Sequence, residues 1–238
     1  MKQVLPACLS LAAVVVSGPL DARAADPAQA QDPKNIQMPQ PGVPQAMTIE
    51  GRYIRVAYNN EGYVILGYRT ANLSVGQDWL VLEVGMSLRD GVDDYSLNRD
   101  AFSLDTPDGK NVPLPSNTDF RAANLGALEN RANVQRDSIN YFPPSARKAC
   151  RIGFFAELSS RARPWDQVDL SPTRACLGRL YFPVAGGIAY GQYWLNVKFK
   201  DSLIRVPFRV LTKEEDKLLD KNYDSIKKQI DEAFRKKS

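Results

Sequence analysis

The sequence predicts a mainly β protein, a two-sheet immunoglobulin-like sandwich followed by an amphipathic C-terminal helix. Three features carry this prediction: an alternating run at 78–90, a pair of alternating runs at 193–199 and 204–210, and a helical stripe after residue 212. In the first run, every second residue from Leu80 to Leu88 is large and apolar. Because successive side chains of a strand point to opposite faces, we expect one face in a core and the other partly in water.

The two later runs predict an antiparallel hairpin. Apolar residues alternate in both, at Tyr193, Leu195, Val197, Phe199, Ile204, Val206, Phe208 and Val210. The opposite face is basic, with Lys198, Lys200, Arg205 and Arg209. Such a face can meet a phosphate-rich surface or can simply be solvated, and both readings stay open.

The chain between the linker and the long strand predicts a further hairpin. Residues 49–58 alternate, residues 59–62 form a turn cluster, and residues 63–69 are again rich in β-formers. After the long strand, acidic residues gather at Asp90, Asp93, Asp94 and Asp100. They lack the spacing and the glycine of an EF-hand loop, so we expect turns there and no metal.

The first 47 residues predict export and a tether. Lys2, the apolar run 4–16 and the small residues at 22–24 have the pattern of a secretory signal peptide over residues 1–24. We therefore expect a periplasmic or extracellular protein with no transmembrane span after cleavage; an uncleaved anchor is the alternative. Residues 25–47 are rich in proline and glutamine and predict a disordered linker, either a tether or a proline-rich ligand for a partner.

The cysteine and histidine content restricts the chemistry. The chain has three cysteines and no histidine, which excludes Ser-His-Asp and Cys-His catalysis. Removal of the signal peptide leaves Cys150 and Cys176, and an oxidising compartment favours a disulfide between them. No motif for nucleotides or catalysis is present, so we predict no enzyme and no cofactor. The net charge of +4 is too modest to indicate nucleic acid.

The C-terminal residues 212–238 predict a capped helix. Thr212 and Glu215 have the spacing of a capping box. The apolar stripe consists of Leu219, Tyr223, Ile226, Ile230 and Phe234. This stripe must be covered, and the sequence leaves three possibilities open: the parent domain, a partner that is another envelope protein or a second copy, and a membrane surface.

The long insert at 115–176 contains the candidate binding residues. We expect a helix around 119–136, interrupted at Gly126, and a strand at 152–156. Aromatic and basic residues follow one another at Tyr141, Phe142, Arg147, Arg163 and Trp165. Together they suit an anionic or glycan partner. Alternatively, the aromatics close the end of the sandwich and the arginines are solvated.

Several segments carry a resemblance to a known family. They are the run 78–90, Phe102-Ser103-Leu104 ahead of Asp108-Gly109-Lys110, and the strands at 180–184 and 193–199. In this order they resemble the telokin-like, immunoglobulin-like domains of exported bacterial proteins, over residues 75–114 and 178–211. The resemblance implies a two-sheet sandwich, and most such domains have no assigned activity. The insert departs from this pattern, so no site residue is carried over.

Together these features predict an exported, non-enzymatic binding or assembly module of the bacterial cell envelope. The alternative is a small-ligand or envelope-glycan binding protein that uses the 141–165 region. An exposed helix stripe would favour assembly, whereas a concave pocket rimmed by Trp165 and arginines would favour ligand binding. A hydrolase without a recognisable motif would need two carboxyl groups about 5 to 10 Å apart in a cleft.

Overall fold

A computed structural model describes residues 46–156 and 163–235, except for the side chains of residues 46, 230, 231 and 233–235. All of these residues belong to one unit, residues 38–238. The predicted signal peptide and residues 25–45 of the predicted linker lie outside the described residues. The first strand begins at Ala46, so the last two residues of the predicted 25–47 linker are instead part of a strand.

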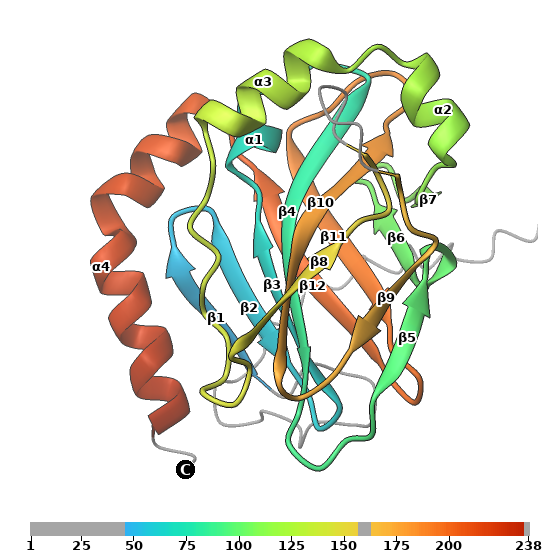
Figure 1. The fold of residues 1–238 in the computed structure, drawn as a ribbon. Helices are drawn as coiled ribbons and strands as arrows, with labels where there is room; N and C mark the ends of the chain where they lie inside the picture. The colour runs from blue at the N-terminus through green and yellow to red at the C-terminus, as the bar shows by residue number, and fades with distance from the viewer. Residues whose placement is uncertain (1–45, 157–162, 236–238) are drawn as a thin grey trace, which may run out of the picture. The chain divides into compact units, whose positions relative to one another are not determined.

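Six strands form the larger sheet, in the order β1-β2-β3-β4-β10-β8 (Figure 1). Their bounds are β1 Ala46–Gly51, β2 Ile54–Tyr58, β3 Gly62–Gly67, β4 Trp79–Leu88, β10 Arg174–Pro183 and β8 Lys148–Ile152. All neighbours are antiparallel except β8, which runs parallel to β10. The edges of this sheet are therefore β1 and β8.

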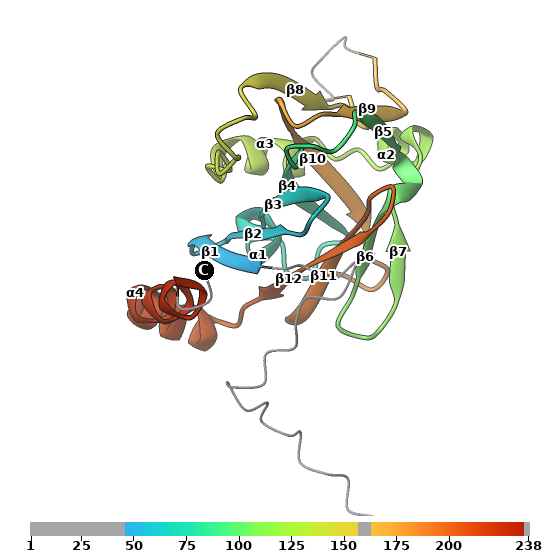
Figure 2. The same cartoon turned by 90° about the horizontal axis from the view of Figure 1, so that it is seen from below.

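A four-stranded sheet in the order β12-β11-β6-β7 packs against the larger sheet, and a β5–β9 pair lies beside β8 and β10 (Figure 2). These strands are β12 Leu203–Val210, β11 Gly191–Lys198, β6 Phe102–Asp105, β7 Asn111–Pro113, β5 Tyr95–Asn98 and β9 Gln167–Leu170. The helices are α1 Arg69–Asn72, α2 Asn117–Ala122, α3 Gly126–Val134 and α4 Lys213–Arg235, with a 3-10 turn at Arg99–Ala101. The predicted mainly β sandwich with a C-terminal helix is confirmed, and an immunoglobulin-like arrangement is compatible with it.

The core lies between the two larger sheets. In β4 the residues from Leu80 to Leu88 at even positions are fully buried, as the alternation predicted. The prediction that the other face is partly wet is wrong, because Val81 and Ser87 are buried there. At Gly85 the ring of Phe142 lies so close that an added Cβ would be 2.8 Å away. The insert thus covers the outer face of β4.

Two predicted element boundaries are wrong. Residues 49–58 form parts of two paired strands, β1 and β2, separated by a turn at Arg52 and Tyr53. The predicted strand at 152–156 is displaced, because β8 ends at Ile152. The predicted helix at 119–136 is broken as expected, with α3 starting at Gly126. Since β8 and β9 both come from the insert, this segment is part of the sheets and not a loop added to them.

The predicted disulfide joins Cys150 of β8 to Cys176 of β10. The two residues are direct partners in the parallel register of these strands. The side chain of Cys176 lies in the core, whereas Cys150 is half-buried. The bond therefore fastens an edge strand to the interior of the larger sheet.

Candidate functional site

A groove of about 670 Å³ lies along the β8 edge of the larger sheet. Its lining comes from residues 148–151 of β8, from Gln167 and Asp169 of β9, and from Trp165 and Arg174. We call this feature the Trp165 groove. It is shallow and open to solvent, and every residue of its lining comes from the insert.

Trp165 forms the apolar wall of the groove. Its backbone N–H donates a 2.7 Å hydrogen bond to the carbonyl oxygen of Gly153, just beyond β8. The indole lies against Gly153, where an added Cβ would be only 3.1 Å from the ring. Glycine at this position therefore lets the ring lie close to the backbone. The side chain nevertheless stays 53% exposed, which is unusual for tryptophan in a well-packed protein.

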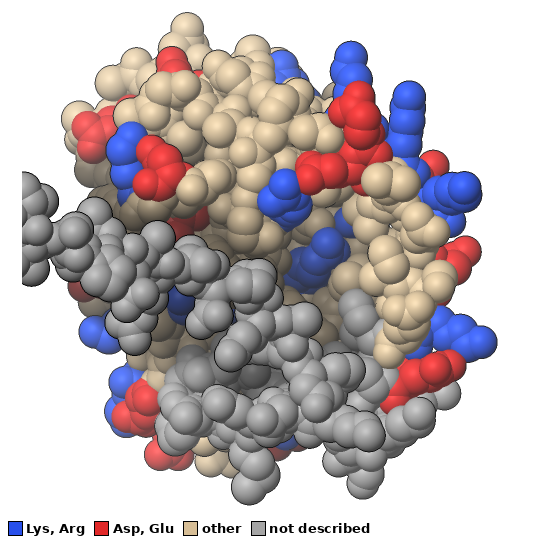
Figure 3. Space-filling model, turned by 180° about the vertical axis from the view of Figure 1, so that it is seen from behind, with Lys and Arg blue, Asp and Glu red and all other residues tan. Residues whose placement is uncertain are grey.

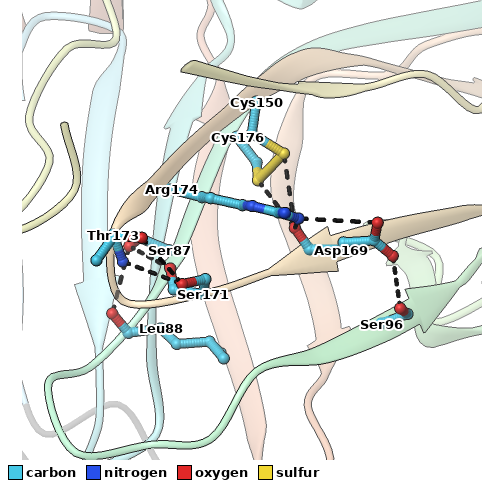
Figure 4. The surroundings of a disulfide bond; sticks show 9 residues. All are labelled: Ser87, Leu88, Ser96, Cys150, Asp169, Ser171, Thr173, Arg174 and Cys176. Atoms are coloured by element: carbon cyan, nitrogen blue, oxygen red, sulfur yellow. Dashed lines mark hydrogen bonds and ion pairs between the residues drawn. A yellow bond between two sulfur atoms is a disulfide. The ribbon is translucent and has the colours of Figure 1, made fainter. Parts of the chain in front are cut away.

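The charged lining of the groove is mostly positive. Lys148, Arg151 and Arg174 face a single carboxylate, that of Asp169. Asp169 lies 3.7 Å from Arg174 and accepts a 2.6 Å hydrogen bond from the Ser96 hydroxyl (Figure 4). Within the part of the chain that the structure describes, Lys148 and Arg151 have no ion-pair partner. Two cationic side chains are thus left for a ligand.

The disulfide lies at the base of the groove. Both sulfur atoms are 3.6 Å from the carbonyl oxygen of Asp169, and Arg174 donates a 3.2 Å hydrogen bond to the same oxygen. Figure 4 shows this oxygen between the cystine and the guanidinium group. These contacts connect β8, β9 and β10, so the wall that carries Lys148 and Arg151 is held in place by a covalent bond.

The structure does not bring the five predicted binding residues together. The Tyr141 hydroxyl donates to the Glu50 carbonyl oxygen on β1, and Phe142 packs over β4. Arg147 donates to the carbonyl oxygen of Pro144. Arg163 is exposed, and of the five residues only Trp165 lines the groove.

The sequence reading missed the basic residues of β8. The signal was present in Lys148 and Arg151, which flank the disulfide cysteine within a short strand. The sequence predicts a strand that starts at Ile152, and this error left Lys148 and Arg151 outside any predicted strand. Arg174 was missed because its role depends on the distant β9.

The C-terminal helix α4 packs on its own domain. The part of the predicted stripe whose side chains are described, Leu219, Tyr223 and Ile226, is half-buried. The helix contacts β1, and Lys227 lies 3.5 Å from Glu50 on that strand. Ile230 and Phe234 of the stripe lie outside the described side chains.

Polar contacts fasten the start of α4 to the turn between β1 and β2. The Tyr53 hydroxyl donates a 2.6 Å hydrogen bond to Asp216. Arg52 forms ion pairs with Asp216 at 3.2 Å and with Asp220 at 3.1 Å. Burial, together with the hydrogen bond to Asp216, raises the pKa of Tyr53 to about 12. The predicted capping box is present, because the Thr212 hydroxyl accepts from the Glu215 amide and the Glu215 carboxylate accepts from the Thr212 amide.

The basic face of the β11–β12 hairpin is partly neutralised. Arg205 pairs with Asp105 at 2.7 Å and lies over the ring of Trp194, and Arg209 pairs with Glu215 at 2.6 Å. Figure 3, which views the molecule from this side, shows basic and acidic side chains next to each other. This interspersed pattern does not favour the reading that the face meets a phosphate-rich surface.

Comparison with known proteins found no relative: no family model, no curated protein and no solved structure matches the chain. Among the residues that the structure describes, no helix is long and apolar enough to cross a membrane. The functional argument therefore rests on the geometry of the chain itself.

Proposed function

We propose that this protein is an exported binding module that holds an acidic glycan in the Trp165 groove. The observation that carries the proposal is the exposed Trp165 next to two cations, Lys148 and Arg151, that have no ion-pair partner in the described part of the chain. Export rests on the predicted signal peptide, and the predicted disulfide agrees with an oxidising compartment.

The unpaired cations favour an anionic ligand. A charged side chain that already has a partner gains little from a ligand, whereas an unpaired one can form a charge-assisted hydrogen bond with a carboxylate. Lys148 and Arg151 lie on the same short strand, three residues apart, and both are exposed. Both line the Trp165 groove, so a ligand with carboxylates spaced along its length can meet both side chains there.

The indole favours a ligand with flat, ring-shaped units. An exposed tryptophan offers a rigid apolar surface at low entropic cost, and the apolar C–H face of a sugar ring can pack on such a surface. The groove is long and shallow, which suits an extended chain better than a compact molecule. A glycan that alternates ring faces and carboxylates combines both requirements.

The alternative function, assembly through the C-terminal helix, has less support. It requires the apolar stripe of α4 to be available to a partner. The described part of that stripe is half-buried, and α4 is fastened to β1 and to the turn that follows it. Trp165 lines one open groove together with Arg151 and Arg174, which supports ligand binding over assembly.

Calorimetric titration with oligogalacturonate, an acidic glycan, tests the proposal. We expect the mature protein to bind this probe and not the neutral maltotriose, with an affinity that falls as salt is added. Trp165→Ala should weaken binding about tenfold, because the stacking surface is lost. The double variant Lys148→Gln/Arg151→Gln should weaken it at least about tenfold and remove most of the salt dependence.

A matched control makes the same charge change elsewhere. Lys198→Gln/Lys200→Gln also removes two positive charges, at the far end of the β11 hairpin, and should leave binding unchanged. Equal affinities of the two double variants would show that net charge attracts the glycan and that the groove is not the site. Equal binding of the acidic and neutral probes would also exclude the proposal.

A further inference from the structure

A second hollow, of about 300 Å³, lies on the outer face of the larger sheet. Its walls come from α3, from the segment after α3, and from β4, β8 and β10. Figure 1 shows α3 and β8 on the same side of this sheet. We call this hollow the α3 pocket. It adjoins the Trp165 groove, because Cys150 and Arg151 line both hollows, and it is less open.

The polar groups at the back of the α3 pocket satisfy one another. Arg179 donates to Asn133 at 2.7 Å, to the Ala132 carbonyl at 3.0 Å and to Glu83 at 3.3 Å. Glu83 also accepts a 2.7 Å hydrogen bond from the amide of Asp137. These contacts occupy the Glu83 carboxylate, so it is poorly suited to act as one of the two free carboxyl groups that a hydrolase would need.

Arginines outnumber carboxylates in the lining of the pocket, with Arg136, Arg151 and Arg179 against Glu83 and Glu129. Arg136 is 69% exposed and only 3.8 Å from Glu83, which is too far for a hydrogen bond. Arg151 extends to the pocket from the β8 side without an ion-pair partner in the described residues. With Arg179 already bound to Glu83, the guanidinium groups that remain for a ligand are those of Arg136 and Arg151.

The remaining wall is apolar. It is formed by Ile139, Ile152, Phe155, Leu177 and Tyr181. Phe155 and Tyr181 are buried and meet edge to face, with ring centroids 5.4 Å apart. Leu177 is only half-buried even though it lies in the middle of a sheet. Small-molecule pockets typically combine such an apolar wall with a few convergent polar groups.

From this arrangement we propose that the α3 pocket binds a small organic carboxylate with an aromatic or branched apolar body. The carboxylate meets Arg136 and Arg151 at the mouth, and the body lies against Leu177 and the aromatic pair. The site shares Arg151 with the Trp165 groove, but Arg136 and the apolar wall belong to the α3 pocket alone, and the site takes a different class of ligand.

Phenylacetate is a suitable probe, with phenylacetamide as its neutral counterpart of the same shape. Ligand-observed NMR and calorimetry on the mature protein should detect binding of phenylacetate at millimolar concentration or below. Phenylacetamide should bind at least about fivefold more weakly, because it lacks the charge. Arg136→Gln should reduce this preference for phenylacetate.

Leu177→Trp fills the pocket and should abolish phenylacetate binding. Leu203→Trp, which adds the same bulk at a partly exposed leucine of β12, is the matched control and should bind like the parent. Circular dichroism shows whether each variant is folded. Titration with oligogalacturonate shows whether the Trp165 groove of each variant still binds its own ligand. Unchanged binding by a folded Leu177→Trp variant, equal affinity for the acid and the amide, or no binding of phenylacetate would overturn the proposal.

Discussion

The two edges of the larger sheet are protected in different ways. At one edge, α4 covers β1 through ion pairs, a hydrogen bond and half-buried apolar contacts. At the other edge, no helix of the described residues covers β8, which is fastened from within by the disulfide. An unprotected edge strand invites pairing with another chain, so native proteins cover it, shorten it or charge it. This protein covers one edge and shortens and charges the other.

The basic side chains at the two edges differ in their ion pairs. Arg52 and Lys227, two cations that connect β1 and the following turn with α4, have acidic partners, so they are used for attachment. The cations at the β8 edge, Lys148 and Arg151, have none in the described part of the chain. The disulfide fastens β8 where these side chains form no ion pair among the described residues, which agrees with the proposed role of Lys148 and Arg151 in binding a ligand.

The largest expected effect is at the β8 edge. Replacing both Cys150 and Cys176 by serine should lower the free energy of unfolding by about 3 kcal/mol, since the bond closes a loop with a sequence separation of 26. Urea denaturation measures this loss. Hydrogen exchange should show faster exchange of the β8 amides while β1 is unchanged, and oligogalacturonate binding should weaken.

The comparison would break down if the amide hydrogens of β1 and of β8 exchanged faster to the same extent in the variant with both Cys150 and Cys176 replaced by serine. That result would mean that the disulfide stabilises the whole sheet and not its β8 edge in particular. A Ser159→Ala/Ser160→Ala variant, also in the insert, provides a control for substitutions that remove no cross-link.

A smaller effect is expected at the β1 edge. Asp216→Ala removes the acceptor for Tyr53 and one ion-pair partner of Arg52, and should cost about 1 kcal/mol of stability. Asp220→Ala, at a site that is 68% exposed, should cost less than about 0.5 kcal/mol. Thermal unfolding of both variants checks the difference. The contact of α4 with β1 lies within one chain, so the mass of the Asp216→Ala variant in solution should equal that of the parent.

The smallest expected effect is a pH dependence. Burial raises the pKa of Glu83 and of Asp137 above their ordinary values of 4.5 and 3.8. The folded state thus binds protons at Glu83 and Asp137 more tightly than the unfolded state does. The resulting contribution to the free energy of unfolding is complete at pH values below the ordinary pKa, and it is lost as the pH rises through the raised pKa of the folded state. Glu215, at the start of α4, has the opposite effect on stability. The hydrogen bond from Arg209 lowers the pKa of Glu215, so the contribution of this group to stability is lost as the pH falls.

Urea unfolding at pH 7 and at about pH 5 measures these contributions. Acidification over this range should stabilise the protein by less than about 1 kcal/mol, and Glu83→Gln should reduce the gain. Glu215→Gln should leave the gain unaltered, since its group titrates at lower pH. A loss of stability on acidification to pH 5 in the parent would contradict the assignment.

Much of the fold follows from local patterns. The alternation in 78–90 and in the final hairpin predicted β4, β11 and β12, and the capping residues predicted α4, because each pattern is complete within a few neighbouring residues. The predicted disulfide followed from compartment and cysteine count. The wet face expected for β4 was wrong, because the segment that covers it lies more than fifty residues away.

The site was only partly accessible to sequence analysis. Trp165, predicted as a binding residue, is exposed and lines the groove, but its neighbours there are set by strand pairing. Tyr141 and Phe142 are near Arg147 in sequence, yet they contact β1 and β4, while Arg174 reaches the groove from β10. The parallel pairing of β8 with β10 brings this arrangement about, and alternation within one strand contains no information about its neighbour.

The sheet order has a practical consequence for presentation. Strand β1 opens the described chain and α4 closes it, and both lie at one margin of a six-stranded sheet, with the Trp165 groove at the opposite margin. A support, dye or fusion protein joined directly at the start of β1 is attached at the margin away from the groove. Immobilised there on a sensor surface, the protein would display the groove toward the bulk solution, an orientation that random coupling through lysines would destroy by modifying Lys148.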